Sequence, residues 1–173
     1  DEIDSLTKEH NQEVGGETRT RNQFLKEMDS ISDKKNESHI YVIGATNKPW
    51  ALDAPFIRRF QKRILIPPPD YHARVEMFKI YSKEIDLAPD VNIEELVMKT
   101  DGCSGSDIKD VFQTVQLKTV REFFESSNAS DKNAKPRNMN THDFLEVLKT
   151  RSPSIPPETL NKYESWYRDY KAL

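Results

Sequence analysis

Three consecutive prolines at positions 67–69 separate two parts of this 173-residue sequence that follow different patterns. Before them lie two short apolar runs, residues 40–43 and 63–66, which are rich in β-branched and aromatic residues. Runs of this kind, bounded by turn residues, are typical of strands buried in a parallel sheet. After the prolines, apolar residues recur at helical spacing. Proline lacks a backbone donor and restricts the residue before it, so the sequence predicts an α/β part followed by a helical part.

Capping residues mark the starts of the predicted helices in the second part. Asp70, Asn92 and Asn140 each precede an apolar run with helical spacing, and another helix is expected to begin near Ser104 or Ser106. We therefore divide the chain into three parts: the α/β part at residues 1–66, a small helical domain at residues 67–152, and a C-terminal helix within residues 153–173.

The composition indicates a strongly solvated protein of the cytosol. Hydrophobic residues make up 35% of the chain and charged residues 32%, and the mean hydropathy is -0.80. No apolar run approaches the ~20 residues that cross a bilayer, and no signal-peptide core opens the sequence. The net charge of -3 argues against general nucleic-acid binding, so no nucleic-acid partner is expected.

Disulfide and zinc chemistry are excluded by the cysteine and histidine content. Cys103 is the single cysteine, so no internal disulfide can form. The four histidines are scattered without metal-ligand spacing. The locally basic cluster at residues 58–63 can be explained simply as a solvent-exposed surface.

An acidic pair, Asp1 and Glu2, is the first candidate for chemistry. Such a pair can contribute to a Mg²⁺ shell and polarise water, and Mg²⁺ keeps several waters and takes few protein ligands. We predict Asp1 in the metal's outer shell and Glu2 as the group that orients or deprotonates the attacking water. The alternative is that the two carboxylates only complement a helix dipole.

An amide and two guanidinium groups complete the pattern. Asn47 follows the apolar run at residues 40–43, where its side chain can reach a terminal phosphate, although it could equally form the turn before Lys48. Arg58 and Arg59 are costly to bury unpaired, so they must face solvent or an acidic partner, and they can meet developing phosphate charge. A further segment, with Gly102, Ser104 and Gly105, lets the backbone approach a base or ribose.

The phosphate cradle that this chemistry also needs is absent from the sequence. No G-x-x-x-x-G-K-[ST] motif occurs in the 173 residues. The segment alone is therefore expected to bind no ATP and to be inactive, and we expect an upstream segment that carries the cradle. A chain encoded to start at Asp1 would instead favour a non-catalytic fragment that serves as an oligomer or partner interface.

In the order and spacing of these motifs, the sequence resembles the back half of an AAA ATPase of the meiotic clade. This group includes katanin, spastin, and the vacuolar-protein-sorting and archaeal cell-division (Cdv) ATPases. Asp1 and Glu2 match the end of Walker B, residues 44–47 match sensor 1, Arg58 and Arg59 match the arginine fingers, and residues 102–108 match the sensor 2 region. The sensor 2 match lacks an arginine, so backbone contact with adenosine through Gly102, Ser104 and Gly105 is implied there.

The resemblance implies the back half of a P-loop NTPase parallel-sheet domain, followed by a small all-helical lid. It implies ATP and Mg²⁺ as cofactors and a homo-oligomeric ring, a hexamer, in which the arginines act on the nucleotide of the adjacent subunit. The expected function is remodelling of ESCRT-III-like filament proteins in membrane scission or cell division, by a cytoplasmic protein recruited to the membrane or division site through its substrate. A katanin- or spastin-like microtubule-severing ATPase is the alternative.

Two polar segments also have family counterparts. The resemblance places a second pore loop at residues 7–17, where an ordinary surface loop is the alternative, before an amphipathic helix at residues 18–31. Eukaryotic ESCRT-III-disassembling members carry a small β domain that binds an activating cofactor near the position of residues 126–138. Because this stretch is too polar and short for a packed sheet, we expect assembly without such a cofactor.

Overall fold

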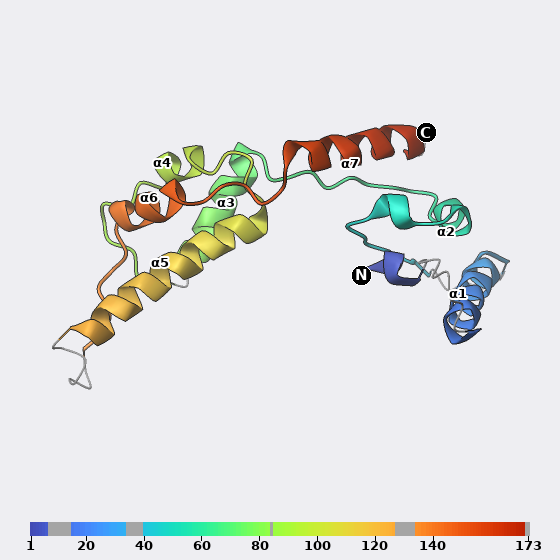
Figure 1. The fold of residues 1–173 in the computed structure, drawn as a ribbon, viewed down its shortest axis with the longest axis horizontal. Coiled ribbons are helices and arrows are strands. Elements are labelled where there is room, and N and C mark those ends of the chain that lie inside the picture. The colour runs from blue at the N-terminus through green and yellow to red at the C-terminus, as the bar shows by residue number, and fades with distance from the viewer. Residues whose placement is uncertain (7–14, 34–39, 84, 127–133, 172–173) are drawn as a thin grey trace. The chain divides into compact units, whose positions relative to one another are not determined.

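The computed structural model describes residues 1–6, 15–33, 40–83, 85–126 and 134–171 (Figure 1). Its residues form two compact units. Unit 1 consists of residues 1–65 and 160–173, and unit 2 of residues 66–159. None of the helices in the described ranges is long and apolar enough to cross a membrane.

Unit 1 is built from short helical elements joined by extended chain. Its elements are η1 (Ile3–Leu6), α1 (Gly15–Asp33), η2 (Pro49–Ala51), α2 (Ala54–Arg59) and most of α7 (Pro157–Tyr170). The apolar side of α1 packs on α2, since Leu25 is buried and Phe24 stacks on the fully buried Phe56 with ring centroids 5.8 Å apart. The amphipathic helix predicted at residues 18–31 is thereby confirmed.

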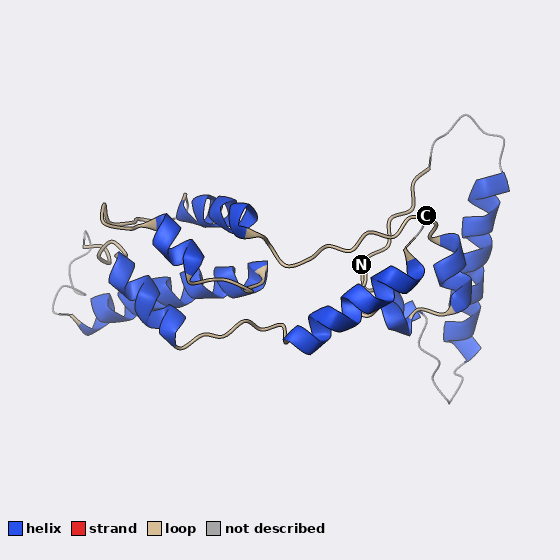
Figure 2. Ribbon diagram, turned by 90° about the horizontal axis from the view of Figure 1, so that it is seen from above, coloured by secondary structure: helices blue, strands red, loops and turns tan. Residues whose placement is uncertain are grey.

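The structure does not confirm the predicted parallel sheet. No strand occurs among the described residues (Figure 2), and residues 40–43 and 63–66 are extended chain. All their apolar side chains except that of Leu65 are exposed, with Ile43 at 91% and Ile64 at 83% of full exposure. The physical reason is that a strand needs a neighbour for its ladder hydrogen bonds, and neither run has one among the described residues.

Unit 2 is a bundle of helices. Helices α3 (Tyr71–Ser82), α4 (Ile93–Met98), α5 (Gly105–Glu125) and α6 (Thr141–Lys149) pack around one core (Figure 1). Three phenylalanines on different helices hold its centre: the ring of Phe112 lies 5.1 Å from those of Phe78 and Phe144, both edge-on. Phe78 and Phe144 are fully buried, as are the core residues Leu96, Val97, Ile108, Val111 and Val115.

The predicted caps start these helices. Asp70, Asn92 and Asn140 are the N-cap residues of α3, α4 and α6, and each side chain accepts a hydrogen bond from a backbone N–H of the first turn. Of the two expected starts of α5, the structure selects Ser104, which forms a capping box with Asp107. Local sequence signals therefore place all four helices of unit 2.

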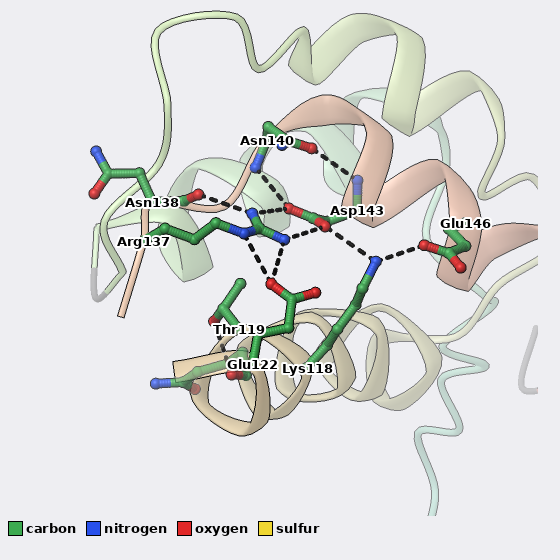
Figure 3. Close-up of polar contacts among 9 residues, drawn as sticks. Lys118, Thr119, Glu122, Arg137, Asn138, Asn140, Asp143 and Glu146 are labelled. Atoms are coloured by element: carbon green, nitrogen blue, oxygen red, sulfur yellow. Dashed lines mark hydrogen bonds and ion pairs between the residues drawn. The ribbon is translucent and has the colours of Figure 1, made fainter. Parts of the chain in front are cut away.

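A buried carboxylate joins α5, α6 and the chain that leads into α6 (Figure 3). Asp143 is 2% exposed and accepts hydrogen bonds from both terminal nitrogens of Arg137, at 2.6 and 2.8 Å, and from Lys118 Nζ at 3.1 Å. Its Oδ2 also accepts from the backbone N–H of Asn140. The hydrogen bonds from Arg137 are the main reason that the pKa of Asp143 lies well below its ordinary range.

We expect the Asp143→Asn substitution to lower the free energy of unfolding by about 1.5–3 kcal/mol, because hydrogen bonds to a charged group contribute about this much. Urea unfolding of the chain, followed by circular dichroism, measures the change. The matched control is Glu122→Gln, which alters an exposed partner of Arg137 and should cost less than about 1 kcal/mol. Equal losses in the two variants would contradict a central role for Asp143.

The same carboxylate predicts a pH dependence. Because the folded-state pKa of Asp143 is depressed, its contribution is fully present above the unfolded-state pKa of about 4 and is lost as the pH falls through the folded-state value. The stability difference between the unaltered chain and Asp143→Asn should be constant from about pH 5 to pH 8 and shrink in stronger acid. Unfolding curves across this range check it, and a difference that shrinks near neutral pH would refute it.

Candidate functional site

The acidic run at the start of the chain lies against residues 44–47. The backbone N–H of Ile3 donates to the carbonyl of Ala45 at 3.1 Å. Thr46 Oγ1 donates to Asp4 Oδ1 at 2.7 Å and accepts from the backbone N–H of Lys48 at 2.9 Å. Asp4 is 8% exposed, so its carboxylate is an internal anchor of this junction. These bonds bring the predicted Walker B end next to the predicted sensor 1 segment.

Gly44 permits a close approach at this junction. A Cβ atom at this position would lie 2.9 Å from Ile3 Cδ1 and 3.0 Å from Phe60 Cζ, closer than side chains normally pack. Phe60 directly follows α2, the helix that ends in Arg58 and Arg59. Gly44 is thus the place where the acidic run, the Asn47 segment and the arginine helix meet.

The two predicted acidic groups are exposed. Asp1 Oδ1 accepts a hydrogen bond from the backbone N–H of Glu2 at 2.9 Å. Glu2 has φ of 53°, a left-handed conformation that a glutamate seldom adopts. Carboxylate oxygens are ligands that Mg²⁺ accepts, so the exposed carboxylates of Asp1 and Glu2 have the chemistry of a Mg²⁺ site. In the described ranges, no three His, Cys, Asp or Glu side chains form a metal-binding group by themselves.

Asn47 is exposed and lies where α7 reaches the junction. Its backbone carbonyl accepts a hydrogen bond from the hydroxyl of Tyr163 at 2.5 Å. The ring of Tyr163 packs on Trp50, with centroids 5.1 Å apart, and Lys162 Nζ lies 3.8 Å from the centre of the Trp50 ring. Tyr163 and Asn47 are 116 positions apart in the sequence, so the C-terminal helix supports the backbone that presents the Asn47 amide.

Arg58 and Arg59 differ sharply in their surroundings. Arg59 forms a bidentate ion pair with Asp29 of α1, at 2.6 and 2.8 Å, and its Nη1 donates to the carbonyl of Pro55 at 3.0 Å. The hydrogen bond with Arg59 lowers the pKa of Asp29, and that with Asp29 raises the pKa of Arg59. The Arg58 side chain is exposed and makes no hydrogen bond or ion pair with the rest of the described chain.

Arg63 fastens the ends of two helices of unit 1. Its two terminal nitrogens donate to the carbonyls of Ile57 in α2 and of Tyr170 at the end of α7. Carbonyl groups in the last turn of a helix lack intrahelical partners, so the guanidinium satisfies both helix ends together. The C-terminal helix is therefore bonded to the arginine helix as well as to the Asn47 segment.

The predicted adenosine contacts lie in unit 2. Gly102 has φ of 74°, a conformation that favours glycine, and Ser104 and Gly105 begin α5. Burial alone would raise the pKa of Asp107, but hydrogen bonds from Ser104 and Ser154 outweigh it and lower the pKa. Cys103 is buried beside them, and burial raises the pKa of its thiol. These bonds fix the loop that would present its backbone to a base or ribose.

Sequence reasoning missed the partners that hold the candidate residues. The sequence placed Asp29 and Tyr163 in predicted helices and Thr46 in the sensor 1 match, but it predicted no partner for any of them. Arg63 was counted in a basic cluster with a solvated face as its plain interpretation. A pattern of apolar spacing cannot show which distant polar groups pair. These contacts are therefore recognised only in the folded chain, from the distances between the paired atoms.

Comparisons with known proteins identify the family. Residues 1–68 match the sequence model described as "ATPase family associated with various cellular activities (AAA)", and residues 90–134 match that of an "AAA+ lid domain". Cell division protein C of Sulfolobus acidocaldarius is 49% identical over 173 residues, which are 100% of this chain and 45% of that protein. This chain belongs to the AAA ATPase family.

A second curated protein and a solved AAA domain also resemble this chain. Meiotic spindle formation protein mei-1 of Caenorhabditis elegans is 30% identical over 181 residues, covering 100% of this chain and 38% of that protein. A crystal structure of the FIGL-1 AAA domain in complex with ADP superposes with a TM-score of 0.83 at 27% identity, over 99% of this chain and 56% of that one. The AAA chain described here thus spans less than half the length of these two curated relatives.

At the junction of this AAA chain, Thr46→Val should weaken the anchoring of Asp4. Valine has the shape of threonine without the hydroxyl, so Asp4 loses a hydrogen-bond donor, at a cost of about 1.5–3 kcal/mol. Both tryptophans, Trp50 and Trp166, lie in unit 1, so urea unfolding followed by tryptophan fluorescence reports on this unit. Thr46→Ser keeps the hydroxyl and should retain most of the stability. If serine and valine cost the same, the hydroxyl bond is unimportant.

Proposed function

We propose that this chain is part of a ring-forming, Mg²⁺-dependent ATPase that remodels ESCRT-III-like protein filaments in cell division or membrane scission. The observation that carries the proposal is the junction at Gly44 in an AAA sequence. The Ile3–Ala45 backbone bond, the Thr46–Asp4 bond and the approach of Phe60 gather the acidic pair, the amide and the arginine helix in one unit.

Within this proposal each candidate residue has a stated role. Asp1 contributes to the outer shell of Mg²⁺, which supplies charge neutralisation for the phosphates when it is bound. Glu2 orients or deprotonates the attacking water, and the Asn47 amide donates to that water or to the terminal phosphate. The backbone around Gly102, Ser104 and Gly105 contacts adenosine. The exposure of Asp1, Glu2 and Asn47 supports these roles, since groups that meet a ligand must be accessible.

The arginine pair is proposed to act on the nucleotide of an adjacent subunit in a hexameric ring. The positive charge at the end of α2 is exposed at Arg58, as an intermolecular role requires. A solved structure titled "Structural Basis for Katanin Self-Assembly" resembles this chain with a TM-score of 0.74 at 28% identity, which supports assembly as a property to test. The phosphate cradle would come from outside these 173 residues.

The choice of substrate rests on the pattern of relatives. The chain is 49% identical to Cell division protein C but 30% identical to mei-1 and 34% identical to a zebrafish spastin. We therefore favour a cell-division role at the membrane or division site over microtubule severing, the alternative. The protein would reach the membrane through its filament substrate.

The Glu2→Gln substitution tests the hydrolytic role. In the longer protein that carries this chain, it should reduce ATP turnover by about 10²–10⁴-fold, the usual contribution of a general base. Nucleotide binding should persist, because the amide keeps the size of the side chain. The matched control is Glu27→Gln on the exposed side of α1, which should leave turnover unchanged. Turnover within a few-fold of the unaltered protein in Glu2→Gln would refute the assignment.

A comparison of substrates tests the remodelling role. The longer protein should release subunits from preformed ESCRT-III-like filaments in the presence of ATP, as measured by sedimentation, and Glu2→Gln should release none. Because no cofactor-binding β domain is expected near residues 126–138, of which residues 127–133 lie outside the described ranges, rings of Glu2→Gln should form with ATP and no added activator. If the protein severs microtubules but leaves ESCRT-III-like filaments intact, the alternative function is favoured.

A further inference from the structure

We propose that Arg74 is a positioning residue for nucleotide binding, which holds the loop at residues 101–105, named here the adenosine loop, against the segment by which the chain enters unit 2. The proposal deepens the proposed function and rests on it, because that function assigns to this loop the backbone contact with adenosine. Arg74 acts through its ion pair with Asp101, which directly precedes Gly102, and not by touching the nucleotide.

Arg74 is a buried cation near the start of α3. It is 6% exposed, although arginine is almost never fully buried unless it is paired. Its Nη1 donates to the carbonyl of Pro69 at 3.1 Å, and its Nη2 forms an ion pair with Asp101 Oδ1 at 3.0 Å. Its Nε is buried with no hydrogen-bond partner among the described residues. Pro69 and Asp101 both lie outside α3, so the guanidinium joins two other segments of unit 2.

The first of these segments is the entrance to unit 2. Pro69 is the last of three consecutive prolines, and none of the three has a backbone N–H that could fix the chain. The segment is instead held by its carbonyl, through Arg74. A guanidinium carries several N–H donors in one plane, so it can bind a carbonyl and a carboxylate at the same time. The ammonium group of lysine, on a flexible stem, does not reproduce this two-point contact.

The second segment is the exposed tip of the adenosine loop. The backbone N–H of Cys103 donates to the carbonyl of Thr100 at 3.1 Å, which closes a four-residue turn. Gly102 takes the third position of this turn with φ of 74°, where a type II turn requires a positive φ. Thr100 and Cys103 are buried, whereas Asp101 and Gly102 are exposed and accessible to a ligand. Arg74 is therefore bonded to the part of the turn that a nucleotide could reach.

The other side of the loop is held by α5. Asp107 accepts hydrogen bonds from the backbone N–H and the hydroxyl of Ser104, both at 2.8 Å. It also accepts from the backbone N–H and the hydroxyl of Ser154, at 3.2 and 3.1 Å, in the chain that leaves unit 2 through α7. Helix capping explains the Ser104 bonds, but it does not explain the ion pair of Arg74 with Asp101. That pair is the added link between the loop and the entrance to unit 2.

The pair with Asp101 affects position more than stability. The Asp101 side chain is 87% exposed, and water screens an ion pair with so exposed a partner. A ligand that contacts the tip of the loop nevertheless finds the tip already ordered, which avoids part of the entropy cost of binding. Glu2 and Asn47 are held by bonds within unit 1. Arg74 should therefore act on nucleotide affinity and not on the hydrolytic step.

Binding of ADP by the longer protein tests the assignment, because ADP is not hydrolysed. Asp101→Ala and Arg74→Lys should each raise the Kd for ADP by about 10-fold, as titration calorimetry measures, since only a fraction of the molecules then holds the loop ready. The double variant should bind no more weakly than either single variant, because both changes break one contact. The Kd for GDP should rise less, so the preference for adenine falls. For ATP hydrolysis, KM should rise while kcat stays within about 3-fold.

The matched control is Glu76→Ala on the same helix. Glu76 is exposed and pairs with Lys79 at 2.7 Å, so this variant also removes a paired carboxylate from unit 2. It should leave the Kd for ADP unchanged. Urea unfolding of all variants checks that they fold, and Asp101→Ala, at an exposed position, decides the case if Arg74→Lys does not fold.

A second readout does not depend on nucleotide. In the 173-residue chain, the backbone N–H of Cys103 reports opening of the turn, because it is bonded to the carbonyl of Thr100. Its hydrogen exchange, followed by nuclear magnetic resonance, should accelerate by at least about 10-fold in Asp101→Ala and Arg74→Lys. Exchange at Val115, in the middle of α5, should not change, and neither amide should change in Glu76→Ala.

The outcomes separate this proposal from the proposed function. If the Kd for ADP is unchanged in both variants, or if Glu76→Ala weakens binding as much, Arg74 does not position the loop for a nucleotide. Unchanged exchange at Cys103 would equally overturn the proposal, since the loop would then keep its order without Arg74. If the longer protein neither hydrolyses ATP nor releases filament subunits, the proposed function fails, while weaker ADP binding and faster exchange in the two variants would still support the role of Arg74.

Discussion

Unit 1 depends on a close approach of backbone at Gly44. The room left by the missing Cβ lets Ile3 and Phe60 come within packing distance of the same residue, 2.9 and 3.0 Å from where that atom would stand. The Ile3–Ala45 backbone bond and the Thr46–Asp4 bond then fix the direction of the chain on both sides. A larger residue would push apart the acidic run and the arginine helix at this point.

The C-terminal helix completes this unit from the far end of the chain. Tyr163 bonds to the carbonyl of Asn47, and Arg63 joins the carbonyls of Ile57 and Tyr170. A displacement of α7 would thus reach the amide through Tyr163 and the arginine helix through Arg63. The Asn47 segment and the arginine helix therefore share α7 as a support.

Local signals in the sequence predicted the helices but not their pairing. Helix starts could be predicted at Asp70, Asn92 and Asn140, because an N-cap side chain bonds to a backbone N–H only a few positions away. The order of acidic pair, amide and arginines indicated the family. The predicted sheet did not form, because residues 40–43 have the composition of a strand but pair with no other strand in the described chain. The Asp29–Arg59 pair, 30 positions apart, depends on how two helices dock, which composition does not encode.

The exposed apolar runs link the unformed sheet to the site. Ile43 at 91% and Ile64 at 83% exposure are side chains that water disfavours, so both runs gain free energy from any strand that pairs with them. Asn47 stands four residues beyond Ile43, and Arg63 directly precedes Ile64. Pairing would therefore straighten and fix the segments that carry the Asn47 amide and the Arg63 support of α2.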